Sequence, residues 1–232
     1  MASGVVMAQR HIMQRNNFSY LLVALLLFII GVPVTYDLEL ISLPVLRVLS
    51  FSCLLAVGIW SLRGDGRLFF VGMSVAIAGI ILNVLAFTSE IDALRIISLV
   101  ALFAFLLLAT VSAMRQVAVG RDLNPNRIVG AICIYLLLGV MWSIAYLLVE
   151  FFQPGSFSGL AELVSPSWSP DWVYYSFVTI TTLGYGDITP VTETARSLSL
   201  AEAIVGQFYI AVVVASLVSA YLSAKQVDSA TE

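Results

Sequence analysis

Charged side chains are scarce in this 232-residue chain, and so are the residue types on which most soluble enzymes depend. Asp, Glu, Lys and Arg make up 11% of the sequence, whereas soluble domains average about 25%. The net charge is only −3, so the chain lacks the basic surface that binds nucleic acid. A single histidine, His11, excludes a histidine-rich metal site. No nucleophile–base or phosphate-loop spacing is present. We therefore expect neither an enzyme nor a bound organic cofactor.

Cysteine is rare as well, while apolar residues are abundant. The two cysteines, Cys53 and Cys133, lie in separate apolar segments, and we expect two buried small side chains rather than a disulfide. Apolar residues make up 60% of the chain, against about 45–50% in soluble domains, and the mean hydropathy is +1.01. This composition predicts a protein that crosses a membrane several times.

Six segments are long and apolar enough for membrane helices, which need ~20 residues. They are residues 18–36, 43–62, 68–88, 91–114, 128–152 and 195–224. The first segment has no small-residue cleavage site behind it, so we expect a retained helix rather than a signal peptide. Between the last two, the apolar run 171–182 is too short to cross. It predicts a re-entrant element, whose irregular backbone is tolerated where protein or a pore surrounds it. The predicted fold is all-α.

Basic residues near the segment ends predict the orientation. One side of a six-crossing arrangement collects Arg10, Arg15, Arg63, Arg67, Arg115, Arg121, Arg127 and Lys225. That side should be cytoplasmic, with both termini inside. The opposite side collects Asp37, Glu39, Glu90, Asp92, Glu150, Glu162, Asp171, Asp187 and Glu193. An acidic outer face would raise the local concentration of cations, although each of these residues taken singly fits an ordinary solvated charge.

The most informative stretch is residues 179–190, Thr-Ile-Thr-Thr-Leu-Gly-Tyr-Gly-Asp-Ile-Thr-Pro. Gly184 and Gly186 allow left-handed backbone angles that residues with a Cβ adopt only with strain. Such angles can point successive carbonyl groups at one axis, where they replace the hydration shell of K⁺. A Gly-Tyr-Gly-Asp sequence by itself also fits an ordinary turn. The apolar run before it and the long apolar segments on both sides favour the carbonyl arrangement.

This stretch resembles the selectivity filter of potassium channels, which has the form T-x-T-T-x-G-Y-G-D. The resemblance implies that K⁺ passes the carbonyls of Thr182, Leu183, Gly184 and Tyr185, with Gly186 at the outer rim and the Thr182 hydroxyl at the innermost site. It also implies that Asp187, Tyr174, Tyr175 and Thr181 support the filter, since the tyrosines stand where many members carry paired tryptophans. Leu183 replaces the usual valine, and we expect its side chain to pack away from the pore. Val178 replaces a glutamate found in some relatives.

Residues 124–221 resemble a complete pore of this superfamily: outer helix, pore helix, filter and inner helix. Together with residues 132–139 and 206–209, they are similar to prokaryotic one-pore ion-channel proteins, which implies a homotetramer, surrounding membrane lipids and a bacterial inner membrane. Ser169 or Asp171 should cap the pore helix, and Asp171 is favoured because its carboxylate complements the helix dipole. Gly206 lies where the family has a gating hinge, and close helix packing explains it equally well. The resemblance also implies a cavity lined by Gln207, Ile210, Val214 and Val218.

The first four segments occupy the place of a voltage sensor, yet they lack its chemistry. Steep voltage gating needs ~3–4 charges per subunit, and the fourth segment carries only Arg95 before Arg115. We expect Arg95 and Arg47 to form structural ion pairs and Asn83 to hydrogen-bond between helices. Gating by ligand, lipid or tension through these helices stays open. The predicted divisions are a cytoplasmic segment 1–17, a four-helix domain 18–115, a pore domain 116–224 and a tail 225–232, too short for a regulatory domain.

Two carboxyl groups fall within the last apolar segments, where they are costly and usually partnered. Glu150 lies near an end, and we expect it to be exposed at the interface. Glu202 lies deeper, and we expect it to hydrogen-bond to the pore helix as a structural brace. The leading function is a K⁺-selective channel. The alternative is a K⁺ transporter subunit, but such chains carry four degraded loops, whereas this chain has one intact loop.

Overall fold

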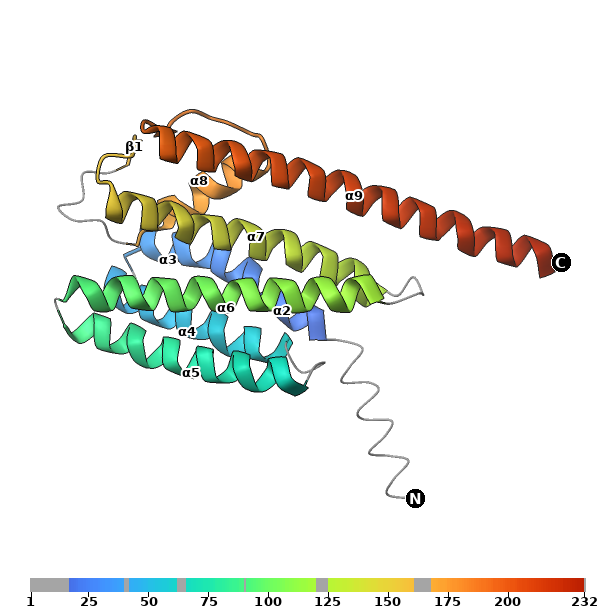
Figure 1. Ribbon diagram of the computed structural model, residues 1–232, viewed down its shortest axis with the longest axis horizontal. Coiled ribbons are helices and arrows are strands. Elements are labelled where there is room, and N and C mark those ends of the chain that lie inside the picture. Colours follow the sequence, from blue (N-terminus) through green and yellow to red (C-terminus); the bar gives the residue numbers. More distant parts are fainter. Residues whose placement is uncertain are drawn as a thin grey trace, which may run out of the picture.

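The computed structural model describes residues 17–39, 42–61, 66–89, 91–119, 125–160 and 168–231. They form a bundle of long helices that lie roughly side by side (Figure 1). In chain order the elements are α2 (Asn17–Leu26), η1 (Leu27–Gly31), α3 (Val32–Asp37), α4 (Leu43–Ser61), α5 (Gly66–Thr88), α6 (Asp92–Val119), α7 (Pro125–Phe152), β1 (Phe157–Ser158), α8 (Pro170–Ile180), β2 (Thr189–Pro190) and α9 (Glu193–Thr231). Each apolar segment that the sequence predicts as a long helix is helical, and only the ends differ.

The first helix is continuous but changes its winding in the middle. A π-helical turn, η1, separates α2 from α3, and Pro33 follows at the beginning of α3. Proline has no backbone N–H and its ring clashes with the preceding turn, so a wider π turn accommodates it. The Thr35 hydroxyl donates a hydrogen bond to the Gly31 carbonyl, the last carbonyl of the π turn. The π turn places Phe28 in the core beside Phe51 of α4 and Trp168.

The four-helix part packs against α7 of the same chain through α2 and α6, an arrangement that the sequence left open. Both α2 and α6 contact α7, and the Cys133 thiol of α7 donates to the Phe18 carbonyl at 3.3 Å. Cys133 is a buried free thiol, as the sequence predicts, whereas the Cys53 side chain lies outside the described residues. The fully buried apolar side chains of α2, α6 and α7 include Leu21, Leu25, Phe105, Leu106, Ile134, Leu137 and Leu147.

Four of the described helical segments are long and apolar enough to cross a membrane. They are Phe18–Asp37, Asp92–Val117, Asn126–Phe152 and Glu193–Ser216. Some side chains of α4 and α5 lie outside the described residues, and α5 contributes the shorter apolar stretch Phe70–Ala86. The structure thus has the helices of an integral membrane protein, and six crossings remain a prediction.

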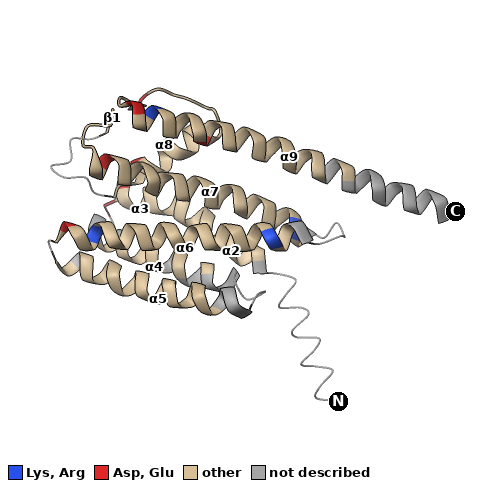
Figure 2. Ribbon diagram, viewed as in Figure 1, with Lys and Arg blue, Asp and Glu red and all other residues tan. Residues whose placement is uncertain are grey.

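Most of the charged residues that the structure describes lie near the helix ends (Figure 2), and Glu202 in the interior of α9 is an exception. Acidic residues begin α6 and α9, at Asp92 and Glu193, and Glu150 lies close to the end of α7. Figure 2 shows the acidic residues mainly at the end of the molecule that holds β1 and α8. Arg115 lies toward the end of α6 and Arg127 at the beginning of α7, at the opposite end of the bundle.

Polar residues in the four-helix part follow the sequence predictions only in part. Arg95 forms the predicted ion pair with Asp92, with an N–O distance of 3.4 Å. The prediction for Asn83 is wrong: its side-chain nitrogen is buried and has no hydrogen-bond partner among the described residues. Asn83 lies in α5, and the side chains around it there are mostly apolar. The side chain of Arg47 and all of Glu90 lie outside the described residues.

Replacement of Gly206 in α9 by alanine should destabilise this fold. A Cβ there would lie 2.5 Å from the carbonyl oxygen of Ile180 at the end of α8, and a backbone atom cannot turn aside as a side chain can. Overpacking of this kind costs about 1–3 kcal/mol, which should lower the midpoint of thermal unfolding in detergent.

Gly31→Ala is the matched control for Gly206→Ala. Gly31 has a helical φ of −69°, and a Cβ there meets no atom within 4 Å. Its replacement should be neutral or should stabilise the protein by up to about 1 kcal/mol, the difference in helix propensity. Equal unfolding midpoints for the two variants would contradict the close contact between α8 and α9.

Candidate functional site

Residues 181–187, here called the glycine segment, leave the end of α8 with an unusual backbone. The φ angles of Thr182, Gly184 and Gly186 are +58°, +60° and +79°, so every second residue is left-handed. The sequence predicts this conformation for the two glycines. Thr182 was not predicted to share it, because a residue with a Cβ reaches this region only at a cost. Alternation of this kind turns successive peptide units over and can bring their carbonyl groups to one side.

Hydrogen bonds show which side of the glycine segment faces the protein. The Leu183 and Gly184 amides both donate to the Val178 carbonyl of α8, at 2.9 and 3.2 Å, and the Thr182 amide donates to Thr179 at 2.9 Å. No hydrogen bond from a described residue reaches the carbonyl oxygens of residues 182–186. The amides therefore fasten the segment to α8 and leave a row of carbonyl oxygens free to bind a cation.

The side chains of the glycine segment are exposed within the chain. The exposed fraction of Leu183 is 55%, so the predicted packing of this side chain does not occur within one chain. The Thr181 hydroxyl turns back to the Phe177 carbonyl of α8 at 2.6 Å. Among the described residues, no group of three His, Cys, Asp or Glu side chains could hold a metal ion.

Tyr174 and Asp187 form the predicted hydrogen bond across the glycine segment. The phenol donates to the carboxylate at 2.6 Å, and the Tyr174 ring stacks on Tyr185 with centroids 6.5 Å apart. This bond lowers the pKa of Asp187 below its ordinary value and raises the pKa of Tyr174 to about 12. Tyr175 does not share this role: its hydroxyl is 2.7 Å from that of Ser199 in α9, because the next residue of a helix faces a different side.

The N-cap residue of α8 differs from the one that the sequence favours. The N-cap residue is Ser169, whose backbone is extended, and Pro170 occupies the first helical positions. Asp171, the residue favoured by the sequence, lies in the first turn and accepts a hydrogen bond from the Ser169 hydroxyl at 3.0 Å. Proline favours the first helical position because its missing N–H is not needed there, which places the cap one residue before it.

The loop after α7 holds the outer end of the glycine segment. β1 pairs with β2 in antiparallel register, Phe157 opposite Pro190 and Ser158 opposite Thr189. Next to this pair, Gly159 has a φ of +88° and lies so close to Asp187 that a Cβ would be 1.8 Å from the Asp187 carbonyl oxygen. Sequence reasoning missed Gly159, because the contact joins residues that are far apart in the chain.

Glu150 stabilises the same loop. Its two carboxylate oxygens accept hydrogen bonds from the amides of Gly155 and Ser156, at 2.7 and 2.9 Å. The sequence predicted simple interfacial exposure, but the side chain is only partly exposed and binds backbone. Ser156 in turn contacts the Thr192 hydroxyl at 3.1 Å, just before α9.

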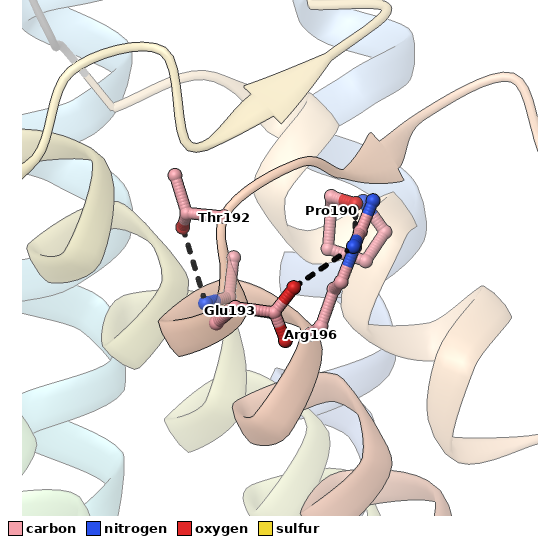
Figure 3. Close-up of polar contacts among 5 residues, drawn as sticks. Pro190, Thr192, Glu193 and Arg196 are labelled. Carbon is pink, nitrogen blue, oxygen red and sulfur yellow. Dashed lines mark hydrogen bonds and ion pairs between the residues drawn. The ribbon is translucent and has the colours of Figure 1, made fainter.

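Short-range polar contacts stabilise the beginning of α9 (Figure 3). The Thr192 hydroxyl accepts a hydrogen bond from the Ala195 amide at 3.4 Å. Arg196 pairs with Glu193 at 3.0 Å and also donates to the Pro190 carbonyl at 3.4 Å. These contacts satisfy free backbone groups at the helix end and connect β2 to α9.

Farther along α9, the predicted cavity residues that the structure describes are exposed. Gln207 and Ile210 are exposed, as is Val214, while the side chain of Val218 lies outside the described residues. The Gln207 amide nitrogen is 3.5 Å from the Thr182 hydroxyl, so α9 passes beneath the inner end of the glycine segment. α9 is continuous through Gly206, and the close contact with Ile180 explains this glycine by packing. The hinge stays a prediction.

Glu202 forms the predicted hydrogen bond to α8. Its carboxyl group is fully buried and contacts the Ser176 hydroxyl of α8 at 2.5 Å. It also accepts a hydrogen bond from Tyr146 of α7. Sequence reasoning missed both partners, because a serine and a tyrosine inside apolar helices give no signal of the contact that packing creates.

Replacement of Gly159 by alanine should displace the backbone of Asp187 and destabilise the loop. Gly155→Ala is the control, because Gly155 has nearly the same φ, +81°, but no atom within 4 Å of an added Cβ. The left-handed backbone alone costs about 1–2 kcal/mol. Gly159→Ala should cost at least about 1 kcal/mol more from the clash, measured by thermal unfolding. Equal losses would contradict the close approach.

Comparison with known proteins identifies the region that contains this site. Residues 132–223 match a family model described as an ion channel. Over 92 residues the chain is 32% identical to "Two pore potassium channel c" of Oryza sativa subsp. japonica, which is 40% of this chain and 18% of that protein. The chain thus covers less than a fifth of this relative. No solved structure gives a significant match.

The matched residues include most of α7, the whole of α8, the glycine segment and most of α9. The matched region contains most of two of the helices that are long and apolar enough to cross a membrane, Asn126–Phe152 and Glu193–Ser216. The chain thus has the apolar helices of an integral membrane protein, and its residues 132–223 are similar to an ion-channel domain.

Proposed function

We propose that this protein is a potassium-selective channel, which conducts K⁺ passively through a pore formed by four identical chains. The backbone of the glycine segment is the observation that carries the proposal. Left-handed angles at Thr182, Gly184 and Gly186 alternate with ordinary ones, and the amides between them bond to α8. The carbonyl oxygens of residues 182–186 accept no hydrogen bond from any described residue, and free oxygens of this kind are what a dehydrated cation requires.

The ion-binding groups are backbone oxygens, with one side chain. Neutral, closely spaced carbonyls replace the hydration shell of K⁺, and here they belong to Thr182, Leu183, Gly184 and Tyr185. The Thr182 hydroxyl completes the innermost site, and Gly186 forms the outer rim. Asp187 and Tyr174 support the segment through their hydrogen bond. The match to an ion-channel family and to a plant potassium channel supports a place in the potassium-channel superfamily.

A homotetramer follows from the copy number of the glycine segment. Each chain carries one segment, and a cage of carbonyl rings needs four. In a single chain, residues 181–187 are all exposed, and α9 extends past the other helices (Figure 1). The outward-facing apolar side chains of α9 include Ile204, Phe208, Ile210, Val212 and Val214. Neighbouring chains and membrane lipids are the partners that such a surface needs.

The channel is not steeply voltage-gated in this proposal. Helix α6 carries only Arg95 and Arg115, and Arg95 is already paired with Asp92. Steep gating needs ~3–4 charges that move through the field. A ligand, a lipid or membrane tension would instead act through the first four helices, which contact α7 of the same chain through α2 and α6.

The proposed location is a bacterial inner membrane with both termini in the cytoplasm. In this orientation the glycine segment lies near the outer surface, on the side of Asp92, Glu150 and Glu193, and Arg115 and Arg127 lie toward the cytoplasm. An acidic outer end concentrates cations at the pore entrance.

Replacement of Gly184 by alanine should abolish K⁺ selectivity. At φ +60° a residue with a Cβ pays about 1–2 kcal/mol for the left-handed backbone, which favours other conformations, in which the carbonyl oxygens lose their common direction. The measurement is K⁺ and Na⁺ flux into liposomes that contain the purified protein, with Ba²⁺ as a blocker.

Gly31→Ala serves as the control for the flux experiment, because an added Cβ there contacts nothing. It should keep the selectivity of the parent protein. Unchanged selectivity in Gly184→Ala would contradict the assignment of the glycine segment, and a parent protein without Ba²⁺-sensitive K⁺ flux would contradict the channel itself.

Replacement of Tyr174 by phenylalanine should make K⁺ flux more sensitive to external acid. The phenol stabilises the ionised form of Asp187 and lowers the pKa of that carboxyl below 3.8. Stabilisation by this bond is fully present above pH ~4 and is lost as the pH falls through the lowered pKa. Without the phenol the pKa of Asp187 moves back up, so flux should decline at a higher pH than in the parent.

Tyr36→Phe, at an exposed phenol of α3, should leave the acid profile unchanged. A Tyr174→Phe profile identical to the parent's would show that the bond does not support the ion path.

A further inference from the structure

Glu202 lies where three helices meet, and it is the most deeply buried carboxyl group among the described residues. Its exposed fraction is 0%. One oxygen, Oε1, is 2.5 Å from the Ser176 Oγ of α8, and the other, Oε2, contacts the Tyr146 hydroxyl of α7. The same Ser176 Oγ is 2.7 Å from the Gly139 carbonyl oxygen of α7. These three short contacts form one chain from Tyr146 through Glu202 and Ser176 to Gly139.

The number of protons in this chain decides the charge of Glu202. Each contact needs one proton between its two oxygens, and the Gly139 carbonyl can only accept. Tyr146 and Ser176 supply one proton each, so two hydroxyl protons serve three contacts. If Ser176 donates to Gly139, nothing lies between Ser176 Oγ and an ionised Oε1, and two bare oxygens at 2.5 Å repel each other. A proton on Glu202 satisfies all three contacts.

The surroundings of Glu202 also favour the neutral form. The ion pairs among the described residues are Arg95–Asp92 and Arg196–Glu193, and neither includes Glu202. A buried charge without a counter-ion is costly. The titratable side chains that face Glu202 are the phenols of Tyr135 and Tyr146 in α7 and Tyr175 in α8. From α9 itself, Ser199 adds a hydroxyl that is already engaged with Tyr175 and Ala195.

We propose that Glu202 holds a proton on Oε1 and donates it to Ser176, and that this neutral acid positions α8 between α7 and α9. Glu202 is a positioning residue, since it does not touch the glycine segment. Its effect on ion flux rests on the channel function proposed above, whereas its protonation does not.

The consequence for the glycine segment follows from the geometry of α8. Ser176 lies two residues before Val178, whose carbonyl accepts the amides of Leu183 and Gly184. Four residues after Glu202, Gly206 lies against the Ile180 carbonyl. Loss of the Glu202 proton breaks the chain of donors at Ser176 and leaves a charge beside α8. Alkaline conditions should therefore loosen the support of the glycine segment and reduce K⁺ flux.

Infrared spectroscopy of the protein in lipid tests the proton directly. The parent should show the carbonyl stretch of a protonated carboxylic acid at neutral pH, and Glu202→Gln should remove it. Glu150→Gln is the matched control, because the two Glu150 oxygens accept from backbone amides that can only donate. Its replacement should leave the band in place.

The glutamine variant also separates a protonated acid from a carboxylate by function. The amide nitrogen of glutamine donates to Ser176 and its oxygen accepts from Tyr146, as the protonated acid does. Glu202→Gln should keep the thermal midpoint and the K⁺ flux of the parent at neutral pH, and it should abolish the loss of flux at alkaline pH. Glu202→Ala cannot make either bond and should lose stability and flux.

The outcomes that overturn the proposal are distinct from failure of the channel function. Absence of the protonated-acid band from the parent, or its survival in Glu202→Gln, overturns the proposal. If Glu202→Gln does not fold, Ser176→Ala provides the test. This variant removes the oxygen that accepts the Glu202 proton, so the band of the protonated acid should shift. An unshifted band overturns the assignment of the proton to Glu202. A parent that shows the band but conducts no K⁺ would contradict the channel and leave the proton on Glu202 established.

Discussion

The close contact between α9 and the end of α8 is the constraint on which the glycine segment depends. Gly206 allows α9 to approach the Ile180 carbonyl oxygen, where a Cβ would be only 2.5 Å away. From the other side, the Tyr135 hydroxyl of α7 donates to the same oxygen at 3.2 Å. The last turn of α8 is thus held between two helices. The glycine segment begins at this turn and bonds back to it through Val178, so its position follows from helix packing.

The outer end of the segment is held by different means. β1 and β2 pair beside it, Gly159 lies against the backbone of Asp187, and Glu150 binds the amides of the same loop. Both ends are therefore fixed by backbone contacts, while the carbonyls between them accept no hydrogen bond from the residues that the structure describes. A site held at its ends with free, preoriented oxygens suits weak and reversible ion binding, because conduction requires that the ion can also leave.

Local sequence patterns were reliable where one short-range effect dominates. Apolar runs of ~20 residues predicted the long helices, and the run 171–182, too short to cross, predicted α8. Patterns failed where two effects compete within a few residues. Asp171 has the charge for a helix cap, but Pro170 sets the first turn and makes Ser169 the cap. Tyr174 and Tyr175 look equivalent in the sequence, yet adjacent helix positions face different neighbours, so only Tyr174 reaches Asp187.

The sequence alone determined the apolar helices, the short helix α8 and the left-handed glycines, because each depends on residues that are neighbours in the chain. The tertiary structure decided which helices pack together: α2 and α6 lie against α7 of their own chain, and α4 and α5 pack against α6. It also placed Thr182 in the left-handed region and surrounded Glu202 with Tyr146 and Ser176. These features join residues tens of positions apart, and hydrogen bonds and steric contacts between such residues depend on distances that only the packed helices determine.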